Sequence, residues 1–367
     1  MSSRDPYQQS HRQHHESFWQ DGPVTPRWAL VVAGVIVLAG AVSAVAIYVT
    51  RQQSDSPAVA AASSSQATSK PLATEPSAPS QHHQTAPSHS LPPATRSTPH
   101  TASGFLPADA EGSFQSLSST LPAQVGLAVQ PLGGGPLREF GDLREGHAWS
   151  SIKVPILATL MREQGEALDA EEEAWASSAI TASDNEAAAS MFGRIEDAQG
   201  GLVGASGAVE SVLHEAGATT TAVATAPPPP GAVSTYGQTV WSLGDAARFF
   251  AALGRCEVLG SGGTGYVESL MEGVIPEQRW GLGEAGFPAG WRVAMKGGWG
   301  PEASSGGSYL VRQSGIVQSD SGGIAVAMMA MDDSGSYPAG AADLTSVAQW
   351  LAGELHGLGP SFAACAS

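Results

Sequence analysis

The chain has 367 residues, with 17 lysines and arginines against 34 aspartates and glutamates, so its formal net charge is −17. This length suffices for about two average domains. The acidic balance argues against nucleic acid as a partner, because phosphate backbones and a negative protein surface repel each other.

The first predicted element is an uncharged, apolar run from Trp28 to Thr50. It is long enough to cross a bilayer as a helix, and Trp28 and Tyr48 lie near its ends, where aromatic rings favour the interface. A cleavable signal peptide is the alternative. Its apolar region would be shorter, whereas this run follows a polar leader, residues 1–27. We therefore expect residues 28–50 to form an uncleaved signal-anchor helix.

Arginine placement predicts the orientation of this span. Arg4, Arg12 and Arg27 precede it, whereas only Arg51 follows closely. The positive-inside rule then makes residues 1–27 a short cytoplasmic tail and places the rest of the chain outside. Since Ala, Gly and Arg are abundant and Lys is rare, the composition fits a bacterium. We expect a single-pass protein of a bacterial cell membrane with an extracytoplasmic domain.

Residues 51–103 are mainly Ser, Pro, Ala, Thr, Gln and His. They offer almost no apolar surface to bury, so this segment is predicted to be a disordered linker. Its histidines fit a solvated tract better than a metal site. The linker would hold a globular domain, residues 104–367, away from the membrane.

The predicted domain carries 11 lysines and arginines against 29 aspartates and glutamates, which gives a net charge of 11 − 29 = −18. Cys256 and Cys365 are the only cysteines of the chain. In an oxidising compartment two cysteines favour one disulfide, which would fix the C-terminal tail to the body. Two free, buried thiols are the alternative.

Strands and helices follow in a clear order. An alternating strand, 124–132, turns at a Gly-rich segment toward a second strand within 136–142. Helices are expected at 150–164, 168–180, 186–195, 209–217 and 242–254, with an irregular Pro-rich loop at 218–239. Three strands at hairpin spacing come next, at 291–299, 308–318 and 322–333. A last helix carries Leu344, Val347, Leu351 and Leu355 on one stripe.

This order predicts an α+β fold within the broad α/β class. A five-stranded antiparallel sheet would be flanked by helices, and an all-helical lobe would be inserted between the second and third strands.

The first candidate site is Ser150 with Lys153, in the segment HAWSSIKVPIL. Positions i and i+3 share a helix face, so the lysine can reach the serine hydroxyl. Partial burial lowers the pKa of an amine, which can then act as a base. Arginine cannot do so, and the domain keeps only two lysines. The alternative is a helix start with a capping serine and a surface lysine.

The second candidate is Ser183-Asp184-Asn185, which contains the only asparagine of the chain. A short loop between helices can aim a hydroxyl and an amide into a cleft. The alternative is a turn that caps a helix.

The third is Lys296-Gly297-Gly298-Trp299, on a predicted strand. The two glycines let another backbone approach closely. A surface lysine on an edge strand is the alternative.

In this order the three motifs resemble those of the penicillin-recognising serine acyl-enzymes, most of all the class A β-lactamases, with S-x-x-K, S-D-N and K-T-G. The resemblance covers most of residues 124–355. It implies a β-lactamase-like serine hydrolase that needs neither a metal nor another cofactor. Its substrate would be a small-molecule β-lactam or a peptidoglycan-like peptide of the cell wall.

The resemblance also implies a role for each residue. Ser150 would be acylated, Lys153 would accept its proton, and Ser183 would pass a proton to the leaving nitrogen. Asn185 would bind the substrate amide, and Asp184 would support the loop. The third motif would bind substrate through Lys296, Gly297, Gly298 and Trp299: Lys296 would hold the substrate carboxylate, and the backbone N–H groups of Ser150 and Trp299 would form the oxyanion hole.

Three departures modify this expectation. The third motif reads K-G-G, so the usual hydroxyl is absent at Gly297. The short spacing from Ser150 to Ser183 implies a reduced helical lobe. The segment from Gly217 to Leu243 contains no Asp or Glu, where class A enzymes place the deacylating glutamate. We therefore expect slow deacylation.

The alternatives are a D,D-peptidase-like penicillin-binding protein and a catalytically degenerate protein that binds an envelope ligand.

Two further motifs do not indicate function. GSGGTG at 260–265 fits the dinucleotide pattern G-x-G-x-x-G, but no predicted βαβ unit surrounds it. SDSGG at 319–323 resembles the nucleophile loop of trypsin-like proteases, but no histidine of the domain lies in a partner motif.

Overall fold

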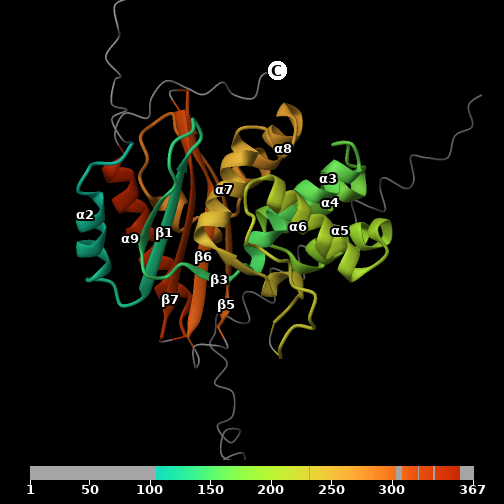
Figure 1. Cartoon of the computed structure of the whole chain (residues 1–367), viewed down its shortest axis with the longest axis horizontal. Coiled ribbons are helices and arrows are strands. Elements are labelled where there is room, and N and C mark those ends of the chain that lie inside the picture. The colour runs from blue at the N-terminus through green and yellow to red at the C-terminus, as the bar shows by residue number, and fades with distance from the viewer. Residues whose placement is uncertain (1–104, 231, 303–307, 321, 334, 356–367) are drawn as a thin grey trace, which may run out of the picture. The chain divides into compact units, whose positions relative to one another are not determined.

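The computed structural model describes residues 105–230, 232–302, 308–320, 322–333 and 335–355 (Figure 1). The predicted cytoplasmic tail, membrane helix and linker lie outside these residues. Cys365 also lies outside them, so the disulfide with Cys256 stays a prediction. Among the helices that the structure describes, none is both long and apolar enough to cross a membrane.

A five-stranded antiparallel sheet forms the centre of the domain, as the sequence predicts, in the order β2-β1-β7-β6-β5 (Figure 1). The first strand pairs with the last, so β1 and β7 lie inside the sheet and β5 lies at an edge. The strands are β1 (Gln124–Pro131), β2 (Arg138–Gly141), β5 (Arg292–Pro301), β6 (Tyr309–Ser319) and β7 (Gly322–Asp332).

Both faces of the sheet are buried, which explains why the strands are apolar almost throughout. In β7, Ala325, Ala327 and Met329 belong to one hydrophobic cluster, whereas Val326 and Met328 belong to the other. Successive residues of a strand point to opposite faces, so the alternation follows directly from the pleat.

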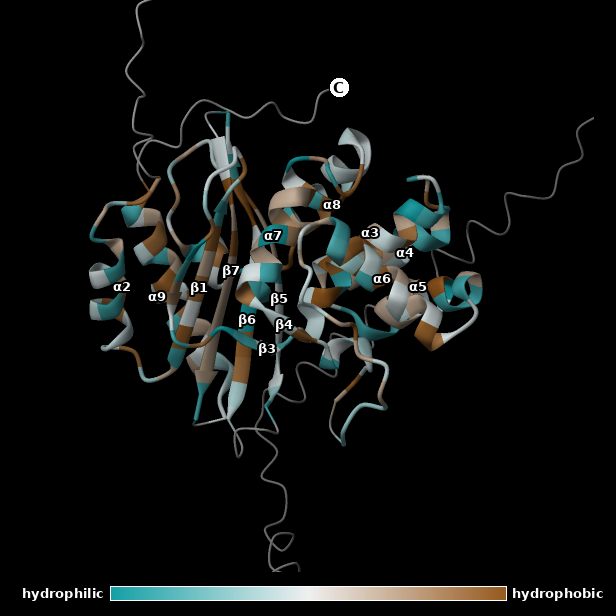
Figure 2. Ribbon diagram, in the orientation of Figure 1, coloured by the Kyte–Doolittle hydropathy of each residue, from teal (hydrophilic) through white to brown (hydrophobic). Residues whose placement is uncertain are grey.

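Helices form a layer on each face of the sheet. On one face α7 packs against β1, β6 and β7, and α8 packs against β5; on the other α9 covers β6 and β7 beside α2 (Figure 1). Their bounds are α2 (Ala110–Ser118), α7 (Leu243–Gly254), α8 (Ser261–Glu272) and α9 (Tyr337–Glu354). Figure 2 shows hydrophobic residues along the sheet and the adjoining helices.

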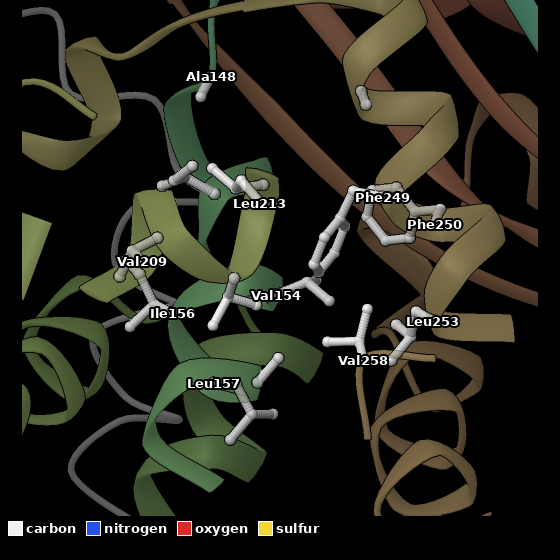
Figure 3. Packing of buried hydrophobic residues seen from close by; sticks show 14 of the residues in the cluster. Ala148, Val154, Ile156, Leu157, Val209, Leu213, Phe249, Phe250, Leu253 and Val258 are labelled. Carbon is white, nitrogen blue, oxygen red and sulfur yellow. The ribbon is translucent and has the colours of Figure 1, made fainter. Parts of the chain in front are cut away.

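The helical lobe lies beyond α7 and α8 and is built around α3. Every residue from Lys153 to Met161 is buried, so this helix is enclosed on all sides. Figure 3 shows Val154 of α3 among side chains of α6 and Phe249 of α7. The lobe consists of α3 (Lys153–Glu163), α4 (Ala170–Thr181), α5 (Asn185–Gln199) and α6 (Leu202–Glu215).

Three parts of the fold differ from the sequence prediction. Helices α2 and α8 were not expected, nor was a two-stranded sheet of β3 (Glu145–His147) and β4 (Val240–Ser242). The predicted helix 150–164 is a 3₁₀ turn, η2 (Trp149–Ile152), followed by α3. The turn matters for function because it carries Ser150.

Candidate active site

Ser150 lies in the η2 turn, between β3 and the buried helix α3. The preceding residue, Trp149, has a positive φ of 47°. Such a conformation is uncommon for a bulky residue and needs support from its surroundings. The support comes from β5, because the Trp149 ring fills the space beside Gly300 that a Cβ would occupy. The turn is thereby fixed against the sheet edge, and Ser150 is only partly buried.

Lys153 begins α3 one turn after Ser150, and its side chain is 1% exposed. Its Nζ donates three hydrogen bonds to the loop before α5: to Ser183 O at 2.6 Å, Asp184 O at 3.1 Å and Asn185 Oδ1 at 2.8 Å. Burial lowers the pKa of Lys153 to about 8, and the charge of Asp184 partly opposes this shift. The alternative of a surface lysine is therefore wrong.

Lys296, on β5, is completely buried and contacts the second motif. Its Nζ donates to Ser183 Oγ at 2.8 Å and to Gly297 O at 3.0 Å. Desolvation, reinforced by the charge of Lys153, lowers the pKa of Lys296 well below its ordinary value. This lysine is not the surface charge that an edge strand often carries, and Ser183 lies between the two amines.

The Ser183-Asp184-Asn185 loop is both a helix cap and a part of the site. The Asp184 carboxylate accepts a hydrogen bond of 2.7 Å from Ala187 N and so caps α5. Ser183 has a φ of 61°, a left-handed conformation that turns the loop toward Lys153 and Lys296. The two interpretations of this motif are therefore compatible.

The glycines of β5 have different surroundings because they point to opposite sides of the strand. A Cβ on Gly298 would lie 2.8 Å from Ala148 O and 2.9 Å from Ser150 N. Only glycine permits β5 to approach the Ser150 turn this closely. A Cβ on Gly297 would instead lie 2.9 Å from Cζ2 of Trp280.

A cleft of about 290 Å³ opens beside these residues. Five predicted site residues line it: Ser150, Lys153, Ser183, Asn185 and Trp299. Asp184, Lys296, Gly297 and Gly298 are not among its lining residues, and they lie behind or beside it. The predicted site is thus brought together, with Lys296 beneath Ser183 rather than in the cleft.

The cleft also has walls that sequence reasoning missed. They include Trp149, Ser234, Tyr236, Gln278 and Tyr309. Tyr236 is buried against Phe192, with ring centroids 4.9 Å apart, and burial raises its pKa to about 12. Except for Trp149, which directly precedes Ser150, no spacing in the sequence connects these residues with Ser150. Ser234 and Tyr236 belong to the Pro-rich loop, which was correctly expected to be irregular but was given no part in the site.

That loop is anchored by the buried Asp245 of α7. Its Oδ2 accepts hydrogen bonds from Thr220 N at 3.0 Å, Thr220 Oγ1 at 2.7 Å and Thr221 Oγ1 at 2.8 Å. Asp245 is 1% exposed, and Arg248 balances its charge at 3.1 Å. A charge-assisted network of this kind holds an otherwise irregular segment in one place.

Chemically, the arrangement combines a partly exposed hydroxyl with two desolvated amines and a second hydroxyl between them. An amine whose pKa is close to neutrality can accept and return a proton. In the part of the chain that the structure describes, no three His, Cys, Asp or Glu side chains gather to hold a metal ion.

Several solved structures have a fold similar to that of the described domain. A representative class A β-lactamase from Bacteroides cellulosilyticus superposes with a TM-score of 0.53 and 14% identity, over 67% of this chain and 97% of that one. PBP-A superposes with a TM-score of 0.52 and 19% identity, over 68% of this chain and 98% of that one. A β-lactamase from Xanthomonas campestris superposes with a TM-score of 0.52 and 16% identity, over 67% of this chain and 97% of that one. No family model and no curated protein sequence matches the chain. The described domain therefore has a class A β-lactamase-like fold.

Proposed function

We propose that this chain is a serine acyl-hydrolase in which Ser150 is acylated by a β-lactam or by a peptidoglycan-like peptide amide. One observation carries the proposal: a buried lysine with a pKa near 8 lies one turn after a serine that lines a cleft. Serine is a weak nucleophile unless a nearby base removes its proton.

Acylation would start with attack by this serine. Ser150 Oγ bonds to the substrate carbonyl carbon while Lys153, in its neutral form, takes the hydroxyl proton. The carbonyl oxygen gains the negative charge, which the backbone N–H groups of Ser150 and Trp299 would stabilise. The carbonyl then re-forms as the C–N bond breaks. Ser183, hydrogen-bonded to Lys296, gives its hydroxyl proton to the leaving nitrogen and takes back the proton held by Lys153, which returns to its neutral form. Asn185 would orient the substrate amide.

We further propose that the acyl-enzyme is long-lived, as in a D,D-peptidase-like penicillin-binding protein. Hydrolysis of the ester needs a base that activates water. The described residues that line the cleft include no Asp or Glu. The solved structures of similar fold include an acyl-enzyme complex of a PBP-A mutant with penicillin G. The lack of a carboxylate among these lining residues favours this function over efficient β-lactamase activity.

Intact-mass measurement after exposure to penicillin G tests the proposal. The expected result is an adduct with the mass of the whole antibiotic, absent from Ser150→Ala and persisting for many minutes after excess drug is removed. A short-lived adduct with ring-opened product would indicate a β-lactamase instead. No mass increase on treatment, in wild type as in Ser150→Ala, would point to the third alternative, a degenerate binding protein.

The location of the domain is part of the proposal. The uncharged run 28–50 and the preceding arginines support a single-pass anchor with the domain outside the bacterial cell membrane. Fractionation of cells and protease treatment of intact spheroplasts test it. The domain should sediment with membranes and be cleaved from outside. Recovery in the soluble fraction would contradict it.

A further inference from the structure

The cleft offers almost no positive charge to a ligand. Among the described lining residues Lys153 is the one lysine or arginine. All three N–H donors of its ammonium form are already hydrogen-bonded to the 183–185 loop. Gly231 and residues 303–307, which the structure does not describe, contain no charged residue in the sequence.

Lys296 does not supply the missing charge. It is 0% exposed and does not line the cleft, and its Nζ donates to Ser183 Oγ and Gly297 O. A carboxylate held beside Ser150 needs donors that can reach it, preferably charged ones. Because Lys296 is 0% exposed, a ligand in the cleft meets the Ser183 side chain rather than the Lys296 ammonium.

Aromatic rings occupy the side of β5 to which a side chain at position 297 would point. Gly297 contributes no side chain, and Trp280 packs against it. Trp280 Nε1 is already bonded to Tyr337 OH at 2.7 Å. The Trp299 ring contacts Tyr337, with centroids 4.8 Å apart. Trp299 is half-buried and, like Tyr309, lines the cleft.

Two acidic residues flank Asn185, a lining residue of the cleft. Asp184 and Glu186 are exposed on either side of Asn185. The domain as a whole carries 11 − 29 = −18 charges. A negative field lowers the local concentration of anions, raises that of cations and leaves that of neutral molecules unchanged.

From these four observations we infer that the cleft selects acyl donors without a free carboxylate beside the reacting amide or ester, with a flat apolar group placed against Trp299. The inference rests on the proposed function and narrows its substrate class. A neutral group in this position does not need a cation to bind it. A planar ring can also pack against the indole of Trp299.

The matched probes are penicillin G and its methyl ester, which differ only in the carboxylate. Two quantities are measured: the rate constant for acylation of the wild-type domain, from intact mass, and the Kd for Ser150→Ala, from calorimetry. We expect the ester to react and bind at least tenfold better than the free acid. An acid that performs as well as the ester overturns the inference, and so does an ester that fails to bind Ser150→Ala. Failure of both probes to acylate the wild type overturns the proposed function, while the binding comparison still decides this inference.

Two exposed valines provide a matched pair of charge variants. Val233 is 67% exposed and lines the cleft, whereas Val203 is 74% exposed on α6, away from it. Val233→Lys should improve binding of the free acid by about tenfold relative to the ester. Val203→Lys adds the same charge to the molecule and should leave the ratio of the Kd of the free acid to that of the ester unchanged. An equal change of this ratio in both variants would show that the missing charge in the cleft does not cause the discrimination.

Discussion

Lys153 combines deep burial with three hydrogen bonds to the 183–185 loop, and its protonation is expected to control acylation. The neutral amine is the active base, so the rate must rise as pH increases toward and through about 8. Between pH 6 and pH 8 the neutral fraction grows by about fiftyfold, and above pH 9 the rate should level off. Intact-mass time courses with one β-lactam from pH 6 to pH 10 check this profile. A flat profile would exclude Lys153 as the base.

Lys153→Arg is the sharpest variant for the same residue, because it keeps the charge but cannot deprotonate. We expect acylation to fall by at least about 100-fold, with no recovery at high pH. Circular dichroism of the variant separates lost chemistry from lost folding. Activity close to that of wild type would show that the amine serves only to hold the loop.

Ser183 is hydrogen-bonded to both amines. Its Oγ accepts a hydrogen bond from Lys296, and its carbonyl oxygen accepts one from Lys153. Ser183→Ala removes the acceptor of a buried donor, which should cost about 1–3 kcal/mol of stability and slow acylation by about 100-fold. Ser190→Ala is the control, because that hydroxyl bonds only to Glu186 O on the exposed side of α5. Equal effects of both changes on acylation would rule out a proton-transfer role for Ser183.

The residues of the three motifs could be selected from the sequence because the chain uses lysine and asparagine so rarely. Their environments could not. Whether Lys296 faces solvent or lies beneath Ser183 depends on which face of β5 meets the helical lobe. Trp280 packs against Gly297 through tertiary structure alone, and nothing in the local sequence indicates it.

Among the elements, β5 is expected to tolerate substitution least, because its backbone contacts the turn that carries Ser150. Gly298→Ala would place a Cβ 2.8 Å from Ala148 O and 2.9 Å from Ser150 N. We expect a loss of about 1–3 kcal/mol in the free energy of unfolding and slower acylation as the turn is displaced.

The control for this change is Gly193→Ala on α5, where a Cβ would meet nothing within 4 Å. Alanine is the better helix former, so that variant should gain up to about 1 kcal/mol. Chemical denaturation and acylation rates measure both effects. A Gly298→Ala protein as stable and reactive as wild type would contradict the close packing of β5 against the turn.

The Pro-rich loop at 218–239 has little regular structure of its own, and its position depends on Asp245. Asp245→Ala removes the acceptor of three hydrogen bonds, from Thr220 N, Thr220 Oγ1 and Thr221 Oγ1. We expect a loss of about 1–3 kcal/mol together with weaker ligand binding, because Tyr236 and Ser234 form a cleft wall. Asp197→Ala, an exposed change on α5, should leave both unaltered.

The elements that the sequence predicts are those with strong periodicity and clear ends, such as the strands of the sheet and helix α7 between Ser242 and Gly254. Helix α8 was missed because it begins Ser-Gly-Gly-Thr-Gly, which disfavours helices. It forms because Thr264, Val267, Glu268 and Met271 share one buried face. Tertiary packing overrides local propensity there.

At the scale of the whole domain, the excess of acidic residues should act on ligands well before they reach the cleft. The domain has a net charge of 11 − 29 = −18, and the exposed Asp184 and Glu186 beside Asn185 contribute to the negative field. At 0.01 M salt such a field extends over roughly 30 Å, and at 0.15 M over roughly 8 Å. Anionic ligands should therefore be repelled mainly at low ionic strength.

The effect of this field can be measured by comparing how salt changes the acylation rates of three forms of one penicillin: the free acid, the methyl ester and an aminoalkyl ester. Raising the ionic strength from 0.01 M to 0.15 M should speed acylation by the anionic free acid by about threefold or more, because repulsion is screened. The neutral methyl ester should be unaffected, and a cationic aminoalkyl ester should slow down. Stopped-time intact-mass measurements on the wild-type domain give all three rates at fixed pH. If the three compounds respond to salt alike, the acidic surface has no part in selecting the ligand, and discrimination against carboxylates must then arise within the cleft, from the burial of Lys296 and the aromatic wall at Trp299.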